Sequence, residues 1–208
     1  MSKNDKKNMT KWNRAAVAVN EAGTKVEFVG GVNRDRIGGN CMVIGHTNEK
    51  GETVRAMFDL GSLFTPYESG FTAAYPDVSD YFDRTDPDSG QVTKAIKPTA
   101  VLCLTHAHED HIGALPYILQ QVNVPVYGTK LTIGLINNKL KEHNLMNNTR
   151  RKVVKYGQNI ILGKFRIEFI KTNHSIADSA ALAIYTPAGL LVHTGDFKID
   201  YTPVFGDM

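Results

Sequence analysis

The sequence feature that most constrains the fold is a cluster of histidines and carboxylates directly after a short apolar run. The stretch "AVLCLT", residues 100–105, is continuously apolar, which is typical of a strand buried on both faces. It leads into "HAHEDH", where three of the seven histidines of this 208-residue chain lie within residues 106–111. Burying such polar groups without partners is costly, so the pattern favours a shared metal ion. We therefore expect a sheet with a metal site at one edge.

The spacing within "HAHEDH" divides the cluster into two sets of ligands. Imidazole nitrogen and carboxylate oxygen are the usual ligands of zinc and related divalent metals. His106 and His108 stand two residues apart where the chain leaves the strand, so both can turn toward one ion. Asp110 and His111 follow where a helix could begin and can face a second ion. The alternative, exposed loop histidines with Asp110 as a helix cap, is disfavoured by the position of the cluster after a buried strand.

Three further polar residues follow other predicted strands. His174 in "KTNHSIADS" and Asp196 in "LLVHTGDFK" each come after an apolar strand, and Asp59 in "MFDLG" does the same upstream. Strand ends that meet at one sheet edge can add His174 to the first ion and let Asp196 bridge both. Asp59 is expected behind the ligands, as an acceptor that orients their imidazoles. A single strand-end Asp before Gly is more often a turn residue, so the case depends on their joint occurrence.

The other histidines and both cysteines are expected to have structural roles. His46 and His143 lie in polar segments and should be solvated, whereas His193 should pack within its strand. Cys41 and Cys103 sit among apolar neighbours. We interpret them as buried thiols of a reducing compartment rather than as a disulfide or a metal pair.

The rest of the chain predicts an α/β layered fold. Strands are expected at 26–31, 40–46 and 53–61, helices at 116–122 and 129–145, and hairpins over 159–172 and 181–196. The stretch 61–99 is rich in Asp, Pro, Ser, Thr and Tyr and should be a loop with one short helix near 78–82. Strands at both ends with helices between them indicate stacked sheets with helices outside.

Charge and hydropathy limit the classes of function. The net charge is +3, but the first fourteen residues hold five basic side chains and one acidic one, so the remainder carries 19 basic and 20 acidic. Charge therefore does not by itself indicate nucleic acid, and the basic cluster at 150–155 fits a solvated surface equally well. No run reaches the roughly 18 apolar residues of a membrane span, and residues 1–14 lack the apolar segment that is typical of a secretory signal. Residues 1–22 should be a disordered basic tail before a domain over 23–208, and a cytoplasmic location without membrane is expected.

The site residues resemble, in chain order, the first four motifs of the metallo-β-lactamase superfamily: Asp59, the "HAHEDH" box, His174 and Asp196. "THAHEDHIGALPYIL" and "NHSIADSAALAIYTPAGLLVHTGDFKID" are further similar to the bacterial ribonuclease J group of its β-CASP branch. The similarity runs from about Val26 to the C-terminus and implies an αββα sandwich. The sequence differs from the pattern of that group in two places. The segment "GGVNRDRIGGN" lacks the glutamate that is usual in the group's first motif, and Ala177 stands where a proline is usual.

The resemblance also implies an incomplete domain. The chain stops twelve residues after Asp196, about where that group inserts its β-CASP domain before the C-terminal half of the fold. We therefore expect the N-terminal portion of a longer enzyme that is a homo-oligomer in full length. An uncovered strand edge and apolar surface should then make the isolated chain self-associate, and its activity should be weak or absent.

The mechanism implied by the resemblance is two-metal hydrolysis of RNA phosphodiester bonds, in exo- or endonuclease mode. One zinc or manganese ion would be held by His106, His108 and His174, and the other by Asp110, His111 and Asp196, with a hydroxide between them as nucleophile. Asp110 would also accept a proton, and Asp59 would support the ligands. The implied substrate is single-stranded RNA, with 5′-monophosphorylated RNA as a candidate. Two alternatives stay open: a hydrolase of a small ester, thioester or lactone, and an inactive metal-binding fragment.

Overall fold

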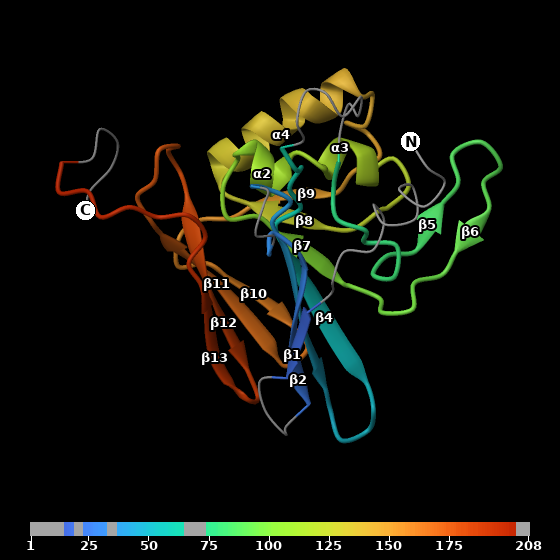
Figure 1. Ribbon diagram of the computed structural model, residues 1–208, viewed down its shortest axis with the longest axis horizontal. Coiled ribbons are helices and arrows are strands. Elements are labelled where there is room, and N and C mark those ends of the chain that lie inside the picture. Colours follow the sequence, from blue (N-terminus) through green and yellow to red (C-terminus); the bar gives the residue numbers. More distant parts are fainter. Residues whose placement is uncertain (1–14, 19–22, 33–36, 65–73, 203–208) are drawn as a thin grey trace, which may run out of the picture.

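The apolar run before the histidine cluster forms strand β7 (Val101–Cys103), whose three residues are all buried, as expected for a strand covered on both faces. The computed structural model describes residues 15–18, 23–32, 37–64 and 74–202. Within them, helices, a seven-stranded sheet and a four-stranded sheet lie in successive layers (Figure 1). This arrangement confirms the predicted α/β fold of stacked sheets.

The seven-stranded sheet, called the first sheet, is mixed. Its order is β1-β2-β3-β4-β7-β8-β9, where β1 to β4 pair antiparallel and β4, β7, β8 and β9 pair parallel. The other bounds are β1 Ala15–Ala18, β2 Thr24–Gly30, β3 Cys41–Thr47, β4 Thr53–Phe58, β8 Val126–Gly128 and β9 Arg151–Val153. Parallel neighbours need crossover connections, and these contain α2 (Glu109–Ile112), α3 (Leu115–Ile118) and α4 (Lys130–Glu142).

The four-stranded sheet, called the second sheet, is antiparallel throughout. It consists of β10 (Asn159–Leu162), β11 (Phe165–Lys171), β12 (Ala180–Thr186) and β13 (Gly189–His193), paired in chain order. The two hairpins predicted from the turn residues are thereby confirmed. Alternate residues of β11, such as Phe165, Ile167 and Phe169, are buried, because successive side chains of a strand point to opposite faces.

The apolar core has two parts, one on each face of the first sheet. On β4, Met57 packs with the helix residues such as Ile136, whereas Phe58 packs with second-sheet residues such as Phe169. Both faces of the first sheet are thus covered. Packing on both faces holds the ends of β4 and β7 in place, and the predicted site residues Asp59 and His106 follow these ends.

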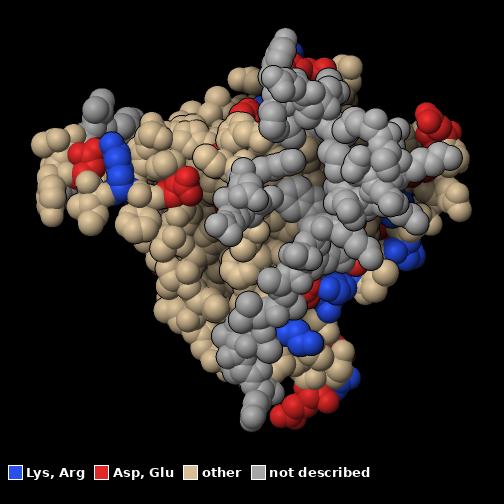
Figure 2. Space-filling view, in the orientation of Figure 1, with Lys and Arg blue, Asp and Glu red and all other residues tan. Residues whose placement is uncertain are grey.

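The outer face of the second sheet carries exposed apolar side chains beside the charged pair Arg166 and Glu168. Ile161, Leu190 and Val192 are 67%, 56% and 58% exposed, and no helix of the described residues packs against this face. The surface over this part of the molecule is mostly uncharged in Figure 2. Exposed apolar area of this kind fits the expected tendency to self-associate, which stays a prediction.

Two sequence expectations for loops and the tail are corrected. Residues 78–82 form a turn rather than a helix, because the carbonyl groups of Asp80 and Tyr81 accept hydrogen bonds from the distant N–H groups of Lys97 and Thr99. Residues 15–18 are not part of a disordered tail. They form β1, which pairs with β2. The backbone N–H and C=O groups of β2 that would otherwise be unpaired at the sheet edge therefore have partners. Residues 1–14 and 19–22 lie outside the described residues.

Short elements that the sequence did not predict complete the architecture. The expected loop over 61–99 contains a hairpin of β5 (Arg84–Thr85) and β6 (Val92–Thr93) around the turn "TDPDSG". β9 lies within the basic cluster at 150–155. There the guanidinium of Arg150 donates to Asn123 at 2.9 and 2.8 Å, so this part of the cluster has a structural role. The predicted helices are confirmed, with α3 shorter than expected.

Candidate metal centre

Strand ends from both sheets meet beside α2 and bring the predicted site residues together. Asp59 follows β4, Thr105 and His106 follow β7, and Asp110 and His111 lie in α2. The second sheet contributes His174 after β11 and Asp196 after β13. A hydrogen bond from the N–H of Ala180 to the carbonyl of Thr105, 2.9 Å long, joins the sheets at this edge.

The first set of ligand atoms consists of three imidazole nitrogens. His108 Nδ1 lies 3.0 Å from His106 Nε2 and 3.1 Å from His174 Nε2. One ligand atom from each residue lies within 4.8 Å of the other two. Two nitrogens bound to the same zinc ion are at most about 4.2 Å apart, so the two short distances suit a shared ion.

The second set joins His106 and His111 to Asp196, whose ligand atoms also lie within 4.8 Å of one another. The carboxylate of Asp196 stands between the two sets, with Oδ1 3.4 Å from His111 Nε2 and Oδ2 3.6 Å from His174 Nε2. Asp110 is outside this set, and its Oδ2 lies 3.6 Å from His111 Nε2. The arrangement differs from the expected one in that His106 belongs to both sets.

Asp59 lies behind the ligands and is completely buried. Its carboxylate accepts from the backbone N–H of Thr105 at 2.8 Å, from the Thr105 hydroxyl at 2.9 Å and from His111 Nδ1 at 2.8 Å. Because Nδ1 of His111 is held in this way, its Nε2 faces the ligand set. The hydroxyl of Thr105 gives its hydrogen to Asp59 and can accept from His106 Nδ1, 3.0 Å away, which likewise leaves Nε2 of His106 toward the site.

Burial and neighbouring charges give the histidines of the site different pKa values. Burial, reinforced by His111, lowers the pKa of His106 to about 3, and burial also lowers the pKa of His174. Both rings are therefore neutral near pH 7 and can offer a lone pair. Burial would lower the pKa of His111 too, but Asp59 raises it to about 9. Burial would raise the pKa of Asp59, and His111 keeps it below its usual value.

Backbone contacts hold α2 against the strand ends. The carbonyl groups of Glu109, Asp110 and His111 accept from the N–H groups of Ser62, Asn40 and Leu60 at 3.0, 3.0 and 2.8 Å. Gly61 lies within this contact, where a Cβ would overlap the carbonyl oxygen of Asp110. Only glycine allows the chain to approach α2 so closely.

We expect Gly61→Ala to displace α2, which carries Asp110 and His111, and to weaken metal binding. Overpacking of this kind should lower the free energy of unfolding by about 1–3 kcal/mol. Gly134→Ala in α4 is the control, since no atom lies within 4 Å of its Cβ position, and it should raise stability by about 0.5–1 kcal/mol. Urea unfolding and metal titration measure both quantities, and a Gly61→Ala protein with unchanged values would contradict the packing argument.

His193, which was expected to adjoin the site but to pack within its strand, also contributes to the site. Its Nδ1 accepts from the N–H of Gly195 at 3.0 Å, and its Nε2 lies 3.7 Å from Asp59 Oδ2. The ring therefore shapes the turn that leads to Asp196. Asn40, whose amide nitrogen lies 3.0 Å from His111 Nε2 and 3.2 Å from Asp110 Oδ2, was also missed. The sequence did contain a signal for His193, because it begins the motif "HTGD" that ends in the candidate ligand Asp196.

The remaining histidines and both cysteines offer no ligand atom to either set. His46 is buried and bonded to Thr24 at 2.9 Å, so the expectation that it is solvated is wrong. His143 is partly buried, with its ring against Tyr117. Cys41 and Cys103 are free and buried, as expected, and burial raises the pKa of both thiols.

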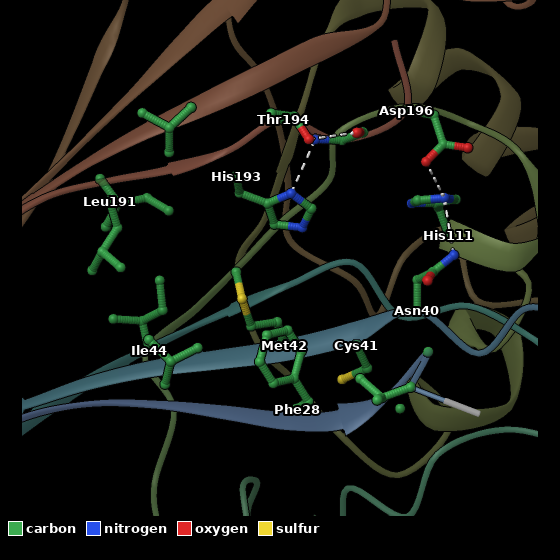
Figure 3. A pocket seen from close by; sticks show the side chains of 17 residues that line it. Phe28, Asn40, Cys41, Met42, Ile44, His111, Leu191, His193, Thr194 and Asp196 are labelled. Carbon is green, nitrogen blue, oxygen red and sulfur yellow. Dashed lines mark hydrogen bonds and ion pairs between the residues drawn. The ribbon is translucent and has the colours of Figure 1, made fainter. Parts of the chain in front are cut away.

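A cavity of about 500 Å³ extends from the site between the two sheets. Figure 3 shows its polar end at Asn40, His111 and Asp196, and its apolar side chains, such as Ile44 and Leu191, farther along. The site thus opens on one side into a mainly apolar space.

Sequence comparison connects this geometry with known proteins. The sequence profile of the metallo-beta-lactamase superfamily matches residues 35–201. Ribonuclease J of Helicobacter pylori (strain ATCC 700392 / 26695) is 42% identical over 187 residues, 88% of this chain and 24% of that protein. Ribonuclease J of Mycobacterium tuberculosis (strain ATCC 25618 / H37Rv) is 36% identical, over 88% of this chain and 30% of that protein. The chain therefore spans about a quarter of the length of such relatives.

Solved structures support the fold. A protein of unknown function from Enterococcus faecalis V583 has a TM-score of 0.62 at 24% identity, covering 84% of this chain and 44% of that one. The metallo-beta-lactamase fold protein YhfI from Bacillus subtilis has a TM-score of 0.52 at 20% identity, covering 83% and 62%. Within the described residues, no helix combines the length and apolar character needed to cross a bilayer.

Proposed function

We propose that the protein acts as a metal-dependent ribonuclease, starting from the fact that the chain belongs to the metallo-β-lactamase superfamily. The observation that carries the proposal is the convergence of three imidazole nitrogens at 3.0 and 3.1 Å beside a carboxylate that lies between two ligand sets. The similarity to ribonuclease J proteins at 36–42% identity supports RNA as the substrate class.

The donor set fits two divalent cations. Imidazoles and carboxylates are ligands that zinc accepts readily, and manganese also accepts carboxylates; His111 would release its Nε2 proton when metal binds. We assign His106, His108 and His174 to one ion and His111, Asp196 and Asp110 to the other, with Asp196 shared. When bound, the ions would supply a hydroxide nucleophile at neutral pH and offset charge on the phosphoryl oxygens.

The protein's own residues orient the site and handle protons. Asp59 and Thr105 hold the rings of His111 and His106 with Nε2 forward, which removes the need to reorganise them during reaction. Asp110 lies at the edge of the second set, where its carboxylate can accept a proton from the attacking group. We further propose single-stranded RNA, including 5′-monophosphorylated RNA, as substrate, action in the cytoplasm, and a homo-oligomeric full-length protein. The two buried free thiols are consistent with that compartment.

Metal content and cleavage test the proposal together. Protein purified without chelator should contain zinc or manganese, up to two ions per chain, by elemental analysis. Cleavage of labelled single-stranded RNA, which is expected to be weak for the 208-residue chain, should stop in EDTA. Absence of any transition metal after reconstitution would overturn the site. Cleavage of a small thioester, ester or lactone without RNA cleavage would instead favour the alternative hydrolase function.

A further inference from the structure

Two cavities adjoin the candidate metal centre, and they differ in chemistry. The cavity of about 500 Å³ reaches His111 and Asp196 and is lined largely by apolar side chains such as Phe28 and Met42. A second cavity of about 310 Å³ reaches His174, and all its lining side chains except Ile176 and Ala177 are polar or charged. The backbone of RNA is anionic and hydrated, so the second cavity, called the polar pocket, suits it better.

The walls of the polar pocket are the two segments that carry His174 and Asp196. They comprise residues 171–178 and residues 198 and 200. The N–H of Lys198 donates to the carbonyl of Asn173 at 2.7 Å, so the two segments are joined. The hydroxyl of Tyr156, also in the lining, donates to Asp178 Oδ1 at 2.9 Å. These bonds preform the pocket beside a metal ligand.

Two lysines, Lys171 and Lys198, line the polar pocket together with Asp178 and Asp200. The carboxylate of Asp178 is engaged, because Oδ2 accepts from the N–H of Leu131 at the start of α4, where the helix dipole favours negative charge. Asp200 is paired with Lys198 at 2.7 Å. Basic and acidic side chains gather over the C-terminal segment in Figure 2.

The Lys198–Asp200 pair is open to exchange. The Lys198 side chain is 51% exposed and that of Asp200 is 19% exposed, and an ion pair that water reaches on its lysine side contributes little to stability. Its ammonium group can therefore turn to a phosphate at small cost. Ser175 and Asn173 add hydroxyl and amide groups to the lining, which can hydrogen-bond phosphate or ribose oxygens.

We propose that the polar pocket binds the phosphodiester next to the scissile one in single-stranded RNA, with Lys171 and Lys198 contacting phosphate. The inference rests on the proposed ribonuclease function and adds a substrate-positioning site to it. A volume of about 310 Å³ accommodates one phosphate and its sugar. A strand bound there would leave His174 beside the neighbouring phosphate.

The salt dependence of RNA binding tests the pocket without catalysis. Fluorescence anisotropy would follow a labelled single-stranded RNA in EDTA for wild type, Lys171→Gln, Lys198→Gln, the double variant and Lys50→Gln. Removing one lysine–phosphate pair should reduce the slope of log affinity against log salt by about 0.7. At 0.1 M salt this corresponds to about 5-fold weaker binding per lysine and about 25-fold for the double variant. Lys50, in the turn between β3 and β4, is the matched control and should bind like wild type.

The outcomes separate the pocket from the function on which it rests. A double variant that binds RNA with the wild-type slope overturns the pocket and leaves the ribonuclease proposal standing. An equal reduction in Lys50→Gln shows a diffuse charge effect and also overturns it. A wild-type chain that takes up metal but binds no RNA at low salt overturns both. Unchanged thermal midpoints and metal content in the lysine variants exclude misfolding as the cause of a reduced slope.

Discussion

Asp196→Asn is expected to abolish detectable RNA cleavage and to reduce metal content at both sites. The reason is the position of this carboxylate, which points one oxygen toward His111 and the other toward His174. An amide keeps the shape but removes the negative charge and one acceptor, so it cannot bind two cations in the same way. Elemental analysis and a cleavage assay on the same preparation measure the two effects.

The control for Asp196→Asn is Asp88→Asn, which removes an exposed carboxylate in the turn between β5 and β6. It should leave metal content and cleavage at wild-type values. A side chain that is 45% exposed, as Asp196 is, should not be needed for folding, so both variants should have similar thermal midpoints. Full metal content and normal cleavage in Asp196→Asn would show that Asp196 is a turn residue and nothing more.

Asp59→Asn is expected to weaken metal binding about 10- to 100-fold without removing any ligand. The hydrogen-bond partners of the Asp59 carboxylate are all donors, namely the Thr105 N–H, the Thr105 hydroxyl and His111 Nδ1. An asparagine would turn its NH₂ group toward one of them, which leaves buried donors facing each other. It would also remove the charge that keeps His111 protonated in the metal-free protein.

The same substitution should lower the stability of the metal-free chain by about 3–5 kcal/mol, since it breaks a buried ion pair by removing one partner. Urea unfolding in EDTA measures this quantity. Thr105→Val provides a graded comparison, because it removes the hydroxyl but keeps the backbone N–H, and should cost about 1 kcal/mol. If Asp59→Asn were as stable as wild type and bound metal equally well, Asp59 would have no role in orienting His111.

The identity of the candidate ligands could be predicted from the sequence because it depends on local pattern. A continuous apolar run identifies a buried strand, and polar residues directly after such strands must lie at a sheet edge. His106, His108, His174 and Asp196 all occupy such positions in the sequence. The two hairpins of the second sheet followed in the same way from turn residues with known backbone preferences.

Only the tertiary structure decided which of these groups share a ligand set. His106 lies in both sets and Asp110 at the edge of one, because the packing of α2 against the strand ends aims each side chain. His193 looked like an ordinary strand residue, yet its Nδ1 accepts from Gly195 and its Nε2 faces Asp59 across the two sheets. Contacts between residues distant in the chain depend on how sheets stack, and periodicity carries no information about that stacking. The sequence by itself therefore determined the chemistry of the site, and long-range packing determined its geometry.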